Sequence, residues 1–283
     1  VIGSSSFASS TSIPYHTAKE VIGMEENPLT ALRQKRHASI PVGLRLLKEG
    51  VIDAFISAGN TGALVSAAKM ILGTLPTIRR PALLAMIPTK KRPVAVVDVG
   101  ANIQVKTEHL VQFARIAAAY LKARGIEHPR IGLLNIGSEP IKGTSESRLA
   151  YKALQSLPES PFRFVGNIEG KSVFDGEVDG LITDGFTGNV FLKTAEGIAS
   201  LILDRLEAHI PSDLLDKLTP QLADLQRHLH YADYPGALLV GVKKIVIKCH
   251  GYSTPHSVGK AVFGAVELLK QNFMEVFPEK LIK

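Results

Sequence analysis

The sequence predicts an α/β fold: a largely parallel sheet with helices on both faces, in three layers. Short, nearly continuous apolar runs along the 283 residues suit strands that are buried on both faces. These runs alternate with longer segments of helical periodicity, and such an alternation makes neighbouring strands parallel. The expected strands are 51–58, 82–89, 94–100, 130–137, 162–168, 179–184 and 244–251.

The helical segments between these runs have recognisable ends. Gly50 and Gly73 follow the first two segments, as glycines often follow a helix. Thr107 is the expected N-cap of the third segment. Thr254 and Pro255 supply a cap and a first-turn proline for the last one. The expected helices are 37–50, 62–73, 107–125, 144–157, 188–207 and 255–275.

One region breaks the alternation. Residues 195–230 predict a helical hairpin that projects from a single domain spanning 1–283, with its turn near Pro211. Leucines at three- and four-residue spacing give the second helix an apolar stripe. Such a stripe suits packing against a subunit or the core, and it equally suits a tip that touches a membrane or an acyl chain.

Composition narrows the function classes. The single Cys249 excludes a disulfide framework and suits a reducing cytoplasm. No apolar run approaches the roughly 20 residues that span a bilayer. The net charge of +7 favours anionic partners, whereas the absence of tryptophan argues against a base-stacking platform for single-stranded nucleic acid. The chain opens directly on an apolar stretch at Val1, so we expect a preceding segment to be missing.

A strand, a Gly-x-Thr-Gly turn and a helix start occur twice, as DAFISAGNTGA at 53–63 and DGLITDGFTGNV at 179–190. Ligands of α/β folds bind at the carboxyl ends of parallel strands. A helix that begins there offers free N–H groups to phosphate, and glycine lets a backbone approach closely. The predicted phosphate- or substrate-binding residues are Ser57, Gly59, Asn60, Thr61 and Gly62 in the first copy, and Asp184, Gly185, Thr187 and Gly188 in the second.

Four further strand ends carry polar residues. The motif DVGAN supplies Asp98 and Asn102, and VGNIEG supplies Asn167. His250 follows the last apolar run. NIGSEPIKGTSES holds Lys142 before Gly-Thr, an order that differs from the P-loop, so we do not expect an NTPase. A loop lysine before a Ser- and Thr-rich helix start remains a suitable cation for an oxyanion.

Other chemistries lack their motifs. The sequence has no His-Glu-x-x-His, no pair of cysteines, no nucleophile elbow and no dinucleotide fingerprint. Cys249 and His250 are neighbours on an expected strand, so they point to opposite faces and favour a packed thiol over a catalytic dyad. We therefore expect neither a metal nor an organic cofactor, and we expect a site that positions an anion.

Six motifs in this order carry a resemblance over nearly the whole chain: ISAGNTGAL, VDVGAN, LLNIGSEPIKGT, GNIEG, DGFTGNVFLKTAEG and GVKKIVIKCHG. The series resembles the bacterial phosphate acyltransferase family (PlsX) of phospholipid synthesis. The resemblance implies an isocitrate/isopropylmalate dehydrogenase-like variant of the α/β fold. It also implies transfer of a fatty acyl group from acyl-carrier protein to inorganic phosphate, which gives acyl phosphate for the acylation of glycerol 3-phosphate.

The resemblance further implies a catalytic pair, Lys142 and Asn189. In this hypothesis the two Gly-x-Thr-Gly turns hold phosphate, Lys142 neutralises it, and Asn189 stabilises the oxyanion of the thioester carbonyl. The hairpin receives the acyl chain. The implied partners are acyl-carrier protein, inorganic phosphate, a second copy of the chain, the inner face of the cell membrane and the glycerol-3-phosphate acyltransferase. The implied location is cytoplasmic and peripheral to that membrane, with no nucleic-acid partner.

The chain departs from the family's pattern in three places. It lacks the first strand and its Gly-Gly-Asp motif, Pro235 replaces a usual glycine, and RHASI at 36–40 replaces a usual Asp-Ser-Ser. Three alternatives stay open: a phosphate acyltransferase that uses CoA thioesters, an inactive scaffold for membrane lipid enzymes, and a nucleic-acid binder.

Overall fold

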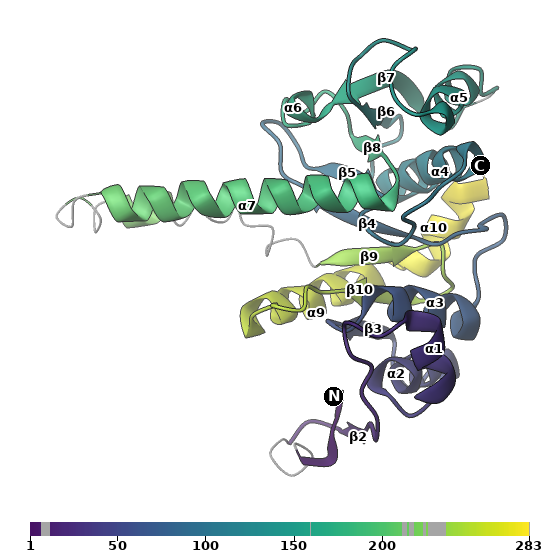
Figure 1. The fold of residues 1–283 in the computed structure, drawn as a ribbon, viewed down its shortest axis with the longest axis vertical. Coiled ribbons are helices and arrows are strands. Elements are labelled where there is room, and N and C mark those ends of the chain that lie inside the picture. Colours follow the sequence, from purple (N-terminus) through teal and green to yellow (C-terminus); the bar gives the residue numbers. More distant parts are fainter. Residues whose placement is uncertain are drawn as a thin grey trace. The chain divides into compact units, whose positions relative to one another are not determined.

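A computed structural model describes residues 1–6, 12–158, 160–210, 214, 218–222, 225 and 236–282, with only the backbone described at positions 207 and 282 (Figure 1). The chain forms two compact units. Unit 1 comprises Val1–Leu84 and Pro235–Lys283, and unit 2 comprises Ala85–Tyr234. Whether the chain acts as the predicted single domain stays a prediction.

Unit 2 contains a parallel sheet in the order β5-β8-β6-β7, in which β5 and β8 are fully buried while the edge strand β7 is mostly half-buried. Val94–Val97 is wholly shielded from water, as its unbroken run of small apolar residues predicts. Because all neighbours are parallel, their carboxyl ends share one edge. The strands are β5 (Val94–Val97), β6 (Arg130–Asn135), β7 (Arg163–Glu169) and β8 (Gly180–Ile182).

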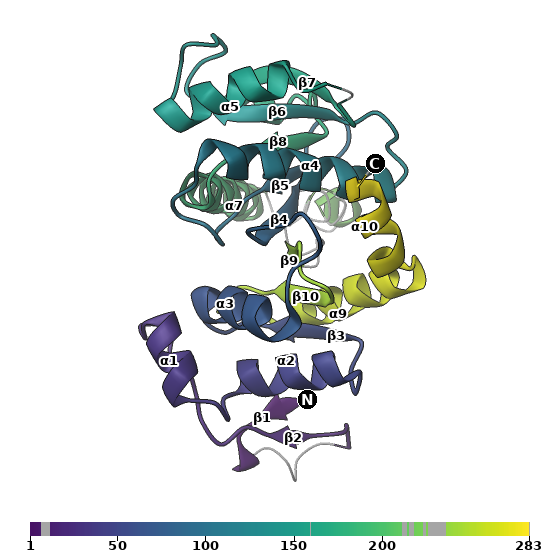
Figure 2. The ribbon, with the colours of Figure 1, turned by 90° about the vertical axis from the view of Figure 1, so that its right-hand side faces the viewer.

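The helices of unit 2 connect these strands. Helix α4 packs on β5, β8 and β6, and α5 packs on β6 and β7. These two helices lie nearest the viewer in Figure 2, while α7 lies behind the strands. In Figure 1, α7 runs outward from the strands of its unit. The helices are α4 (Thr107–Ala123), α5 (Ser145–Gln155), α6 (Gly170–Val173) and α7 (Gly185–His209).

Unit 1 contains the strand order β3-β10-β9-β4, in which β3 and β10 are parallel and β9 is antiparallel to both neighbours. Strand β4 crosses the boundary, because its residues 82–84 belong to unit 1 and 85–87 to unit 2. The strands are β1 (Ile2–Gly3), β2 (His16–Thr17), β3 (Ala54–Ser57), β4 (Ala82–Ile87), β9 (Ala237–Val240) and β10 (Ile245–Lys248). The helices are α1 (Pro28–Gln34), α2 (Ser39–Glu49), α3 (Thr61–Leu72), α9 (Pro255–Lys270) and α10 (Phe273–Ile282).

The predicted fold class is confirmed, because the sheet is mixed but mostly parallel and carries helices. Gly50 ends α2 in the left-handed conformation, and Thr254 caps α9 above Pro255, as expected. Strand β9 was not predicted. Thr107 is the first residue of α4 and not its cap, because its backbone N–H and its hydroxyl both donate to the Glu146 carboxylate, at 2.6 and 2.7 Å. The first half of the expected hairpin is α7, and most of its second half lies outside the described residues.

A buried ion pair ties the amino ends of three strands at the edge opposite the site. Asp179 precedes β8 and is 2% exposed. Its carboxylate accepts from the Arg130 backbone N–H at 2.8 Å, from Nε at 3.0 Å and from a terminal guanidinium nitrogen at 3.1 Å. Arg92 Nε lies 3.5 Å away. Burial alone would raise the pKa of Asp179, but the hydrogen bonds and charge of Arg130, helped by the charge of Arg92, outweigh burial and lower it.

Candidate active site

The carboxyl-terminal edge of the unit 2 sheet brings four predicted segments together. Asp98 follows β5, Asp184 follows β8, the loop 136–143 with Lys142 follows β6, and Asn167 lies near the end of β7. Because the strand order is β5-β8-β6-β7, the start of α7 lies between the Asp98 segment and the Lys142 loop. Ligands of parallel sheets bind at this edge.

Asp98 is fully buried and organises the segment that follows β5. One carboxylate oxygen accepts from the backbone N–H groups of Gly100 and Ala101, at 3.1 and 3.0 Å. The other accepts from the backbone N–H of Asn102 at 2.7 Å and from its side-chain amide at 2.8 Å. With four donors on its carboxylate and no exposed surface, Asp98 shapes the loop 98–102. Asn102 is also buried, and it likewise shapes this loop.

The start of α7 is clamped to this loop. Gly185 donates its N–H to the Asn102 carbonyl at 2.8 Å. Asp184 is the N-cap, and its two oxygens accept from the Thr187 N–H at 2.8 Å and from the Thr187 hydroxyl at 2.7 Å. The N–H of Gly188 donates to the Asp184 carbonyl at 2.9 Å. The N–H groups of Gly185, Thr187 and Gly188 are therefore engaged within the protein, and the predicted contact of this turn with phosphate stays a prediction.

The two glycines of this turn lie close against the loop 98–102. Neither has a positive φ. A Cβ atom at Gly185 would lie 2.7 Å from the carbonyl oxygen of Asn102, and one at Gly188 would overlap the carbonyl oxygen of Asp98. Both contacts are with backbone, which cannot move aside easily. The glycines thus let the helix start approach the neighbouring loop closely enough to place Asn189 beside Gly100.

Asn189 stands one turn inside α7 and is exposed. Within the part of the chain that the structure describes, its side-chain amide makes no hydrogen bond. An amide there can donate to an oxygen that develops negative charge, at the positive end of a 25-residue helix.

Lys142 lies on the loop 136–143, whose backbone is fixed at several points. The Lys142 N–H donates to the Glu139 carbonyl at 3.1 Å, and its own carbonyl accepts from the Asn135 amide at 3.1 Å. Arg148 donates to the Gly143 carbonyl at 2.7 Å. The Lys142 side chain is exposed, and its ammonium has no hydrogen-bond or ion-pair partner among the described residues. It is available to an anion.

Gly143 cannot be replaced without strain. Its φ is +87°, a conformation that side chains rarely adopt. A Cβ atom there would also overlap the Ser147 hydroxyl and approach the Asn135 amide within 2.6 Å. This glycine lets the loop turn directly into α5, whose cap Thr144 accepts from the Ser147 N–H at 3.2 Å.

Large apolar side chains that are exposed to water stand on the same segments as these polar groups. They stand on the segment after Asn102, on the Lys142 loop and on the first turns of α7. Contiguous exposed apolar surface often marks a ligand groove. The residues, with their exposed fractions, are Ile103 (69%), Ile136 (82%), Ile141 (77%), Phe186 (63%) and Val190 (50%).

The first copy of the motif lies in unit 1, and its side chains serve the fold there. Asn60 caps α3: its Oδ1 accepts from the Ala63 N–H at 3.0 Å, and its Nδ2 donates to the carbonyls of Gly23, Met24 and Glu26. Its predicted contact with phosphate stays a prediction, and in the structure the amide caps the helix. Ser57 accepts from the Gly59 N–H at 3.2 Å. Added Cβ atoms at Gly59 and Gly62 would press on Ile40 and Pro28, at 3.1 and 2.6 Å. Thr61 is the first residue of α3.

Cys249 and His250, which are neighbours in sequence, have different surroundings in the structure. Cys249 is buried, as expected, and burial raises the pKa of its thiol, although the charge of Lys248 opposes this. His250 is exposed, stacks on Tyr252 and accepts from the Tyr252 N–H at 3.1 Å. Both residues follow the end of β10, so neither lies on a strand.

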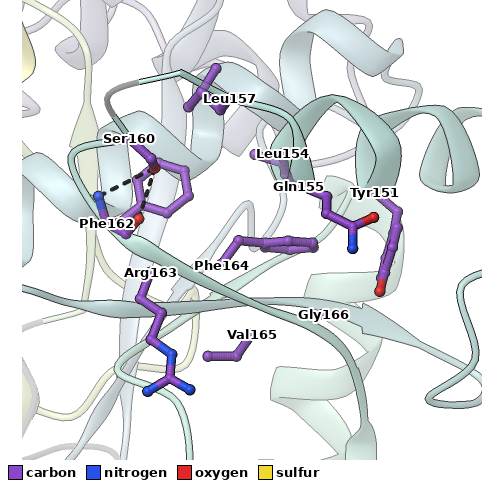
Figure 3. A pocket seen from close by; sticks show the side chains of 10 residues that line it. All are labelled: Tyr151, Leu154, Gln155, Leu157, Ser160, Phe162, Arg163, Phe164, Val165 and Gly166. Carbon is purple, nitrogen blue, oxygen red and sulfur yellow. Dashed lines mark hydrogen bonds between the residues drawn. The ribbon is translucent and has the colours of Figure 1, made fainter.

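A cavity of about 420 Å³ opens elsewhere in unit 2, between α5 and β7 (Figure 3). Tyr151 and Phe164 face each other there, edge to face, with ring centres 5.3 Å apart. No predicted site residue lines it, so we place the candidate site at the strand ends. The lining residues are Tyr151, Leu154, Gln155, Leu157, Ser160, Phe162, Arg163, Phe164, Val165 and Gly166.

Sequence reasoning missed Asn135 and Arg148, which hold the Lys142 loop, and Glu146, which ties α5 to α4. Asn135 ends β6 immediately before the loop, a position that the strand-end argument could have identified. Arg148 and Glu146 gave no such signal. Glu146 reaches Thr107 on another helix, and that contact, 39 residues away, lowers the pKa of its carboxyl through the Thr107 hydroxyl and backbone N–H.

The profile of a family described as "Fatty acid synthesis protein" matches residues 4–276. The chain is 44% identical over 268 residues to a phosphate acyltransferase of Chlamydia pneumoniae, covering 94% of this chain and 79% of that protein. It is 42% identical over 259 residues to the phosphate acyltransferase of Chlamydia abortus, covering 91% and 78%. The chain belongs to the phosphate acyltransferase (PlsX) family. It is thus an acyltransferase of fatty acid and lipid synthesis that transfers an acyl group to phosphate.

Solved structures support the fold of this phosphate acyltransferase. A phosphotransacetylase from Streptococcus pyogenes aligns with a TM-score of 0.57 at 17% identity, covering 90% of this chain and 78% of that one. A branched-chain phosphotransacylase from Enterococcus faecalis aligns with a TM-score of 0.58 at 14% identity, covering 89% and 82%. Among the described helices, none combines the length and apolarity needed to cross a membrane.

Proposed function

We propose that this phosphate acyltransferase takes its acyl group from a fatty acyl-carrier protein and releases an acyl phosphate for phospholipid synthesis. One observation carries the proposal: the Lys142 ammonium and the Asn189 amide are exposed, unengaged among the described residues, and borne by adjacent segments at the carboxyl edge of the sheet. One is a cation for phosphate and the other a donor for an oxyanion.

The chemistry follows from these two groups. Lys142 binds inorganic phosphate and aims one of its oxygens at the thioester carbonyl carbon. That oxygen forms the new bond, the carbonyl oxygen becomes negatively charged, and Asn189 donates to it. The C–S bond then breaks, and the thiolate leaves with its electron pair. Six further residues support this chemistry indirectly, because they hold the start of α7 against its neighbouring loop. They are Asp98, Asn102, Asp184, Gly185, Thr187 and Gly188.

The apolar surroundings favour a long acyl chain. Ile103, Ile136, Ile141, Phe186 and Val190 are all exposed on the segments that carry or flank the catalytic pair. An acetyl group offers these side chains little to bury, whereas each buried CH₂ of a fatty chain contributes about 0.8 kcal/mol. The net charge of +7 favours an acidic carrier as the donor.

The test is phosphate-dependent consumption of a thioester, with the acyl phosphate trapped by hydroxylamine. We expect palmitoyl-carrier protein to react at least tenfold faster than palmitoyl-CoA, and both to exceed acetyl donors. Faster reaction of palmitoyl-CoA would favour the CoA-dependent alternative. No phosphate-dependent reaction with any donor would overturn the catalytic proposal and favour an inactive scaffold.

We also infer a homodimer. Helix α9 in unit 1 exposes five large apolar side chains, four of them at a spacing of three or four residues: Val258, Val262, Phe263, Val266 and Leu269. Such a stripe suits packing against a second copy. Sedimentation should show a dimer, and a Val262→Asp, Phe263→Ser variant should be a monomer. A monomeric parent protein, or a dimeric variant, would contradict this interface.

The proposed place of the enzyme is the cytoplasmic face of the membrane, near the glycerol-3-phosphate acyltransferase that would use its product. Support comes from α7, whose second half exposes Ile198, Leu201 and Ile202 to water. An exposed apolar helix face can lie in the lipid interface.

A further inference from the structure

Asn167 is a buried residue of β7 that contacts the Lys142 loop. Its side chain is 5% exposed. Its Nδ2 donates to the backbone carbonyl of Glu139 at 2.8 Å, across 28 residues of sequence. The amide reaches the loop from the interior of unit 2, whereas the Asn135 and Arg148 side chains hold the loop through more exposed contacts.

The Glu139 carbonyl connects Asn167 to Lys142. It accepts from Asn167 and also from the backbone N–H of Lys142, at 3.1 Å. The turn that presents the Lys142 side chain is therefore closed on an oxygen that Asn167 holds in place. Gly137 lies beneath the side chain, since a Cβ atom there would be 3.1 Å from Lys142 Cγ. Moving the Glu139 carbonyl would move the ammonium.

The other end of the Asn167 amide is unusual. Its Oδ1 is buried and has no hydrogen-bond partner in the described part of the chain. The orientation of the amide is fixed, because only the nitrogen can face a carbonyl oxygen. A buried unpaired acceptor costs free energy, and such groups are rare in folded proteins. The bond from Nδ2 to the Glu139 carbonyl is therefore the polar contact that accounts for an amide at this position.

We propose that Asn167 is the positioning residue of Lys142. It acts through the Glu139 carbonyl and sets where the loop 136–143 presents the ammonium to phosphate. In this role Asn167 contacts neither phosphate nor the acyl donor, whereas the sequence predicted a direct substrate contact. This inference rests on the proposed role of Lys142 and adds the residue that fixes its position.

The principal variant is Asn167→Ala, which removes the donor together with the unpaired acceptor. Asn167→Asp is the second, and it places an acceptor against the Glu139 carbonyl. The matched control is Gln155→Ala, which removes an exposed amide from α5 in the same unit. Thermal melting confirms that each variant is folded before it is assayed.

Three readouts test the role. We expect Asn167→Ala to raise the KM for phosphate at least tenfold, while the KM for the acyl donor changes less than twofold. In Asn167→Ala, hydrogen exchange of the backbone amides at 136–143 should be faster than in the parent protein. This measurement does not require an active enzyme. In a Lys142→Ala background, Asn167→Ala should change the rate less than twofold, because its effect passes through Lys142. Gln155→Ala should match the parent in all three.

The outcomes separate this inference from the proposed function. An unchanged KM for phosphate, unchanged loop exchange, or an equal loss of rate in the Lys142→Ala background would each overturn the positioning role. An inactive parent protein would instead overturn the proposed function. In that case the exchange of the loop amides decides alone whether Asn167 anchors the loop.

Discussion

The backbone carbonyl oxygen of Asp98 occupies the space that a Cβ atom at Gly188 would need. The first residue follows β5 and the second lies in the first turn of α7, so this contact sets how closely the helix start approaches its neighbouring loop. Asn189 is the next residue. The position of the Asn189 side chain, which we propose to be catalytic, thus depends on how closely Gly188 lies against the Asp98 backbone.

Gly188→Ala is expected to destabilise the protein by about 1–3 kcal/mol, the usual cost of overpacking, because backbone cannot yield as a side chain can. Activity should fall with it, since Asn189 must shift. Urea unfolding and the acyl-phosphate assay measure the two effects.

Gly197→Ala is the matched control. Gly197 lies in the same helix, and an added Cβ there meets no atom within 4 Å. Alanine should stabilise the helix by about 0.5–1 kcal/mol and leave activity unchanged. Equal effects of the two substitutions would show that the contact with Asp98 does not constrain α7.

Lys142→Ala and Asn189→Ala should each lower kcat about 10²–10³-fold in a folded protein, the range for removal of one oxyanion donor. For Lys142 we expect a rise in the KM for phosphate as well, because its charge binds that substrate. Steady-state kinetics with both substrates varied provides the measurement. Lys152→Ala, a lysine of α5 in the same unit, should behave like the parent. Near-normal rates for Lys142→Ala or Asn189→Ala would remove that residue from the mechanism.

The fold could be predicted because its central strands β4, β5 and β8 are buried on both faces and therefore appear as continuous apolar runs. Strand β9 escaped because only four residues, Ala237–Val240, follow Pro235-Gly236, a dipeptide typical of a turn. Thr107 was wrongly predicted to be a cap. Its N–H and hydroxyl donate to the carboxylate of Glu146, which belongs to another helix. Local pattern does not contain such tertiary contacts.

The site could be predicted in part for a related reason. Strand-end reasoning identified Asp98, Lys142 and Asn167, and the family resemblance added Asn189. The structure places all four at one edge of a sheet. The glycines of the second turn lie against protein backbone, and a close approach of backbone requires the same residue as a close approach of phosphate, so the sequence could not distinguish the two and their phosphate contact stays a prediction. Asn60 and Asn189 differ because they occupy different positions: Asn60 is the cap of α3, whereas Asn189 is the fifth residue of α7.

Asp179→Asn should destabilise unit 2 by about 2–3 kcal/mol at pH 7, as expected for loss of hydrogen bonds to a charged group. The pKa of Asp179 is lowered on folding from its ordinary 3.8. Its contribution is therefore fully present above pH 4 and is lost as the pH falls through the lower folded pKa. The difference between parent and variant should shrink below pH 4.

Urea unfolding between pH 2.5 and 7 measures this difference. Asp53→Asn is the matched control, because Asp53 aligns with Asp179 in the first copy of the motif but is exposed. It should change stability by less than about 0.5 kcal/mol. A constant difference for Asp179→Asn across the pH range would show that its ionisation is not coupled to folding.

Helix α7 should bind anionic lipid vesicles through its exposed apolar residues. Ile198, Leu201 and Ile202 recur at helical spacing and are about half exposed. Replacing all three by serine removes the surface that would enter the interface, so vesicle co-sedimentation should fall at least tenfold while phosphate-dependent activity on a soluble donor persists. Leu149→Ser removes an equally exposed leucine from α5 and should leave binding unchanged. Undiminished binding of the triple variant would exclude α7 as the membrane contact, and equal loss in Leu149→Ser would point to non-specific adsorption.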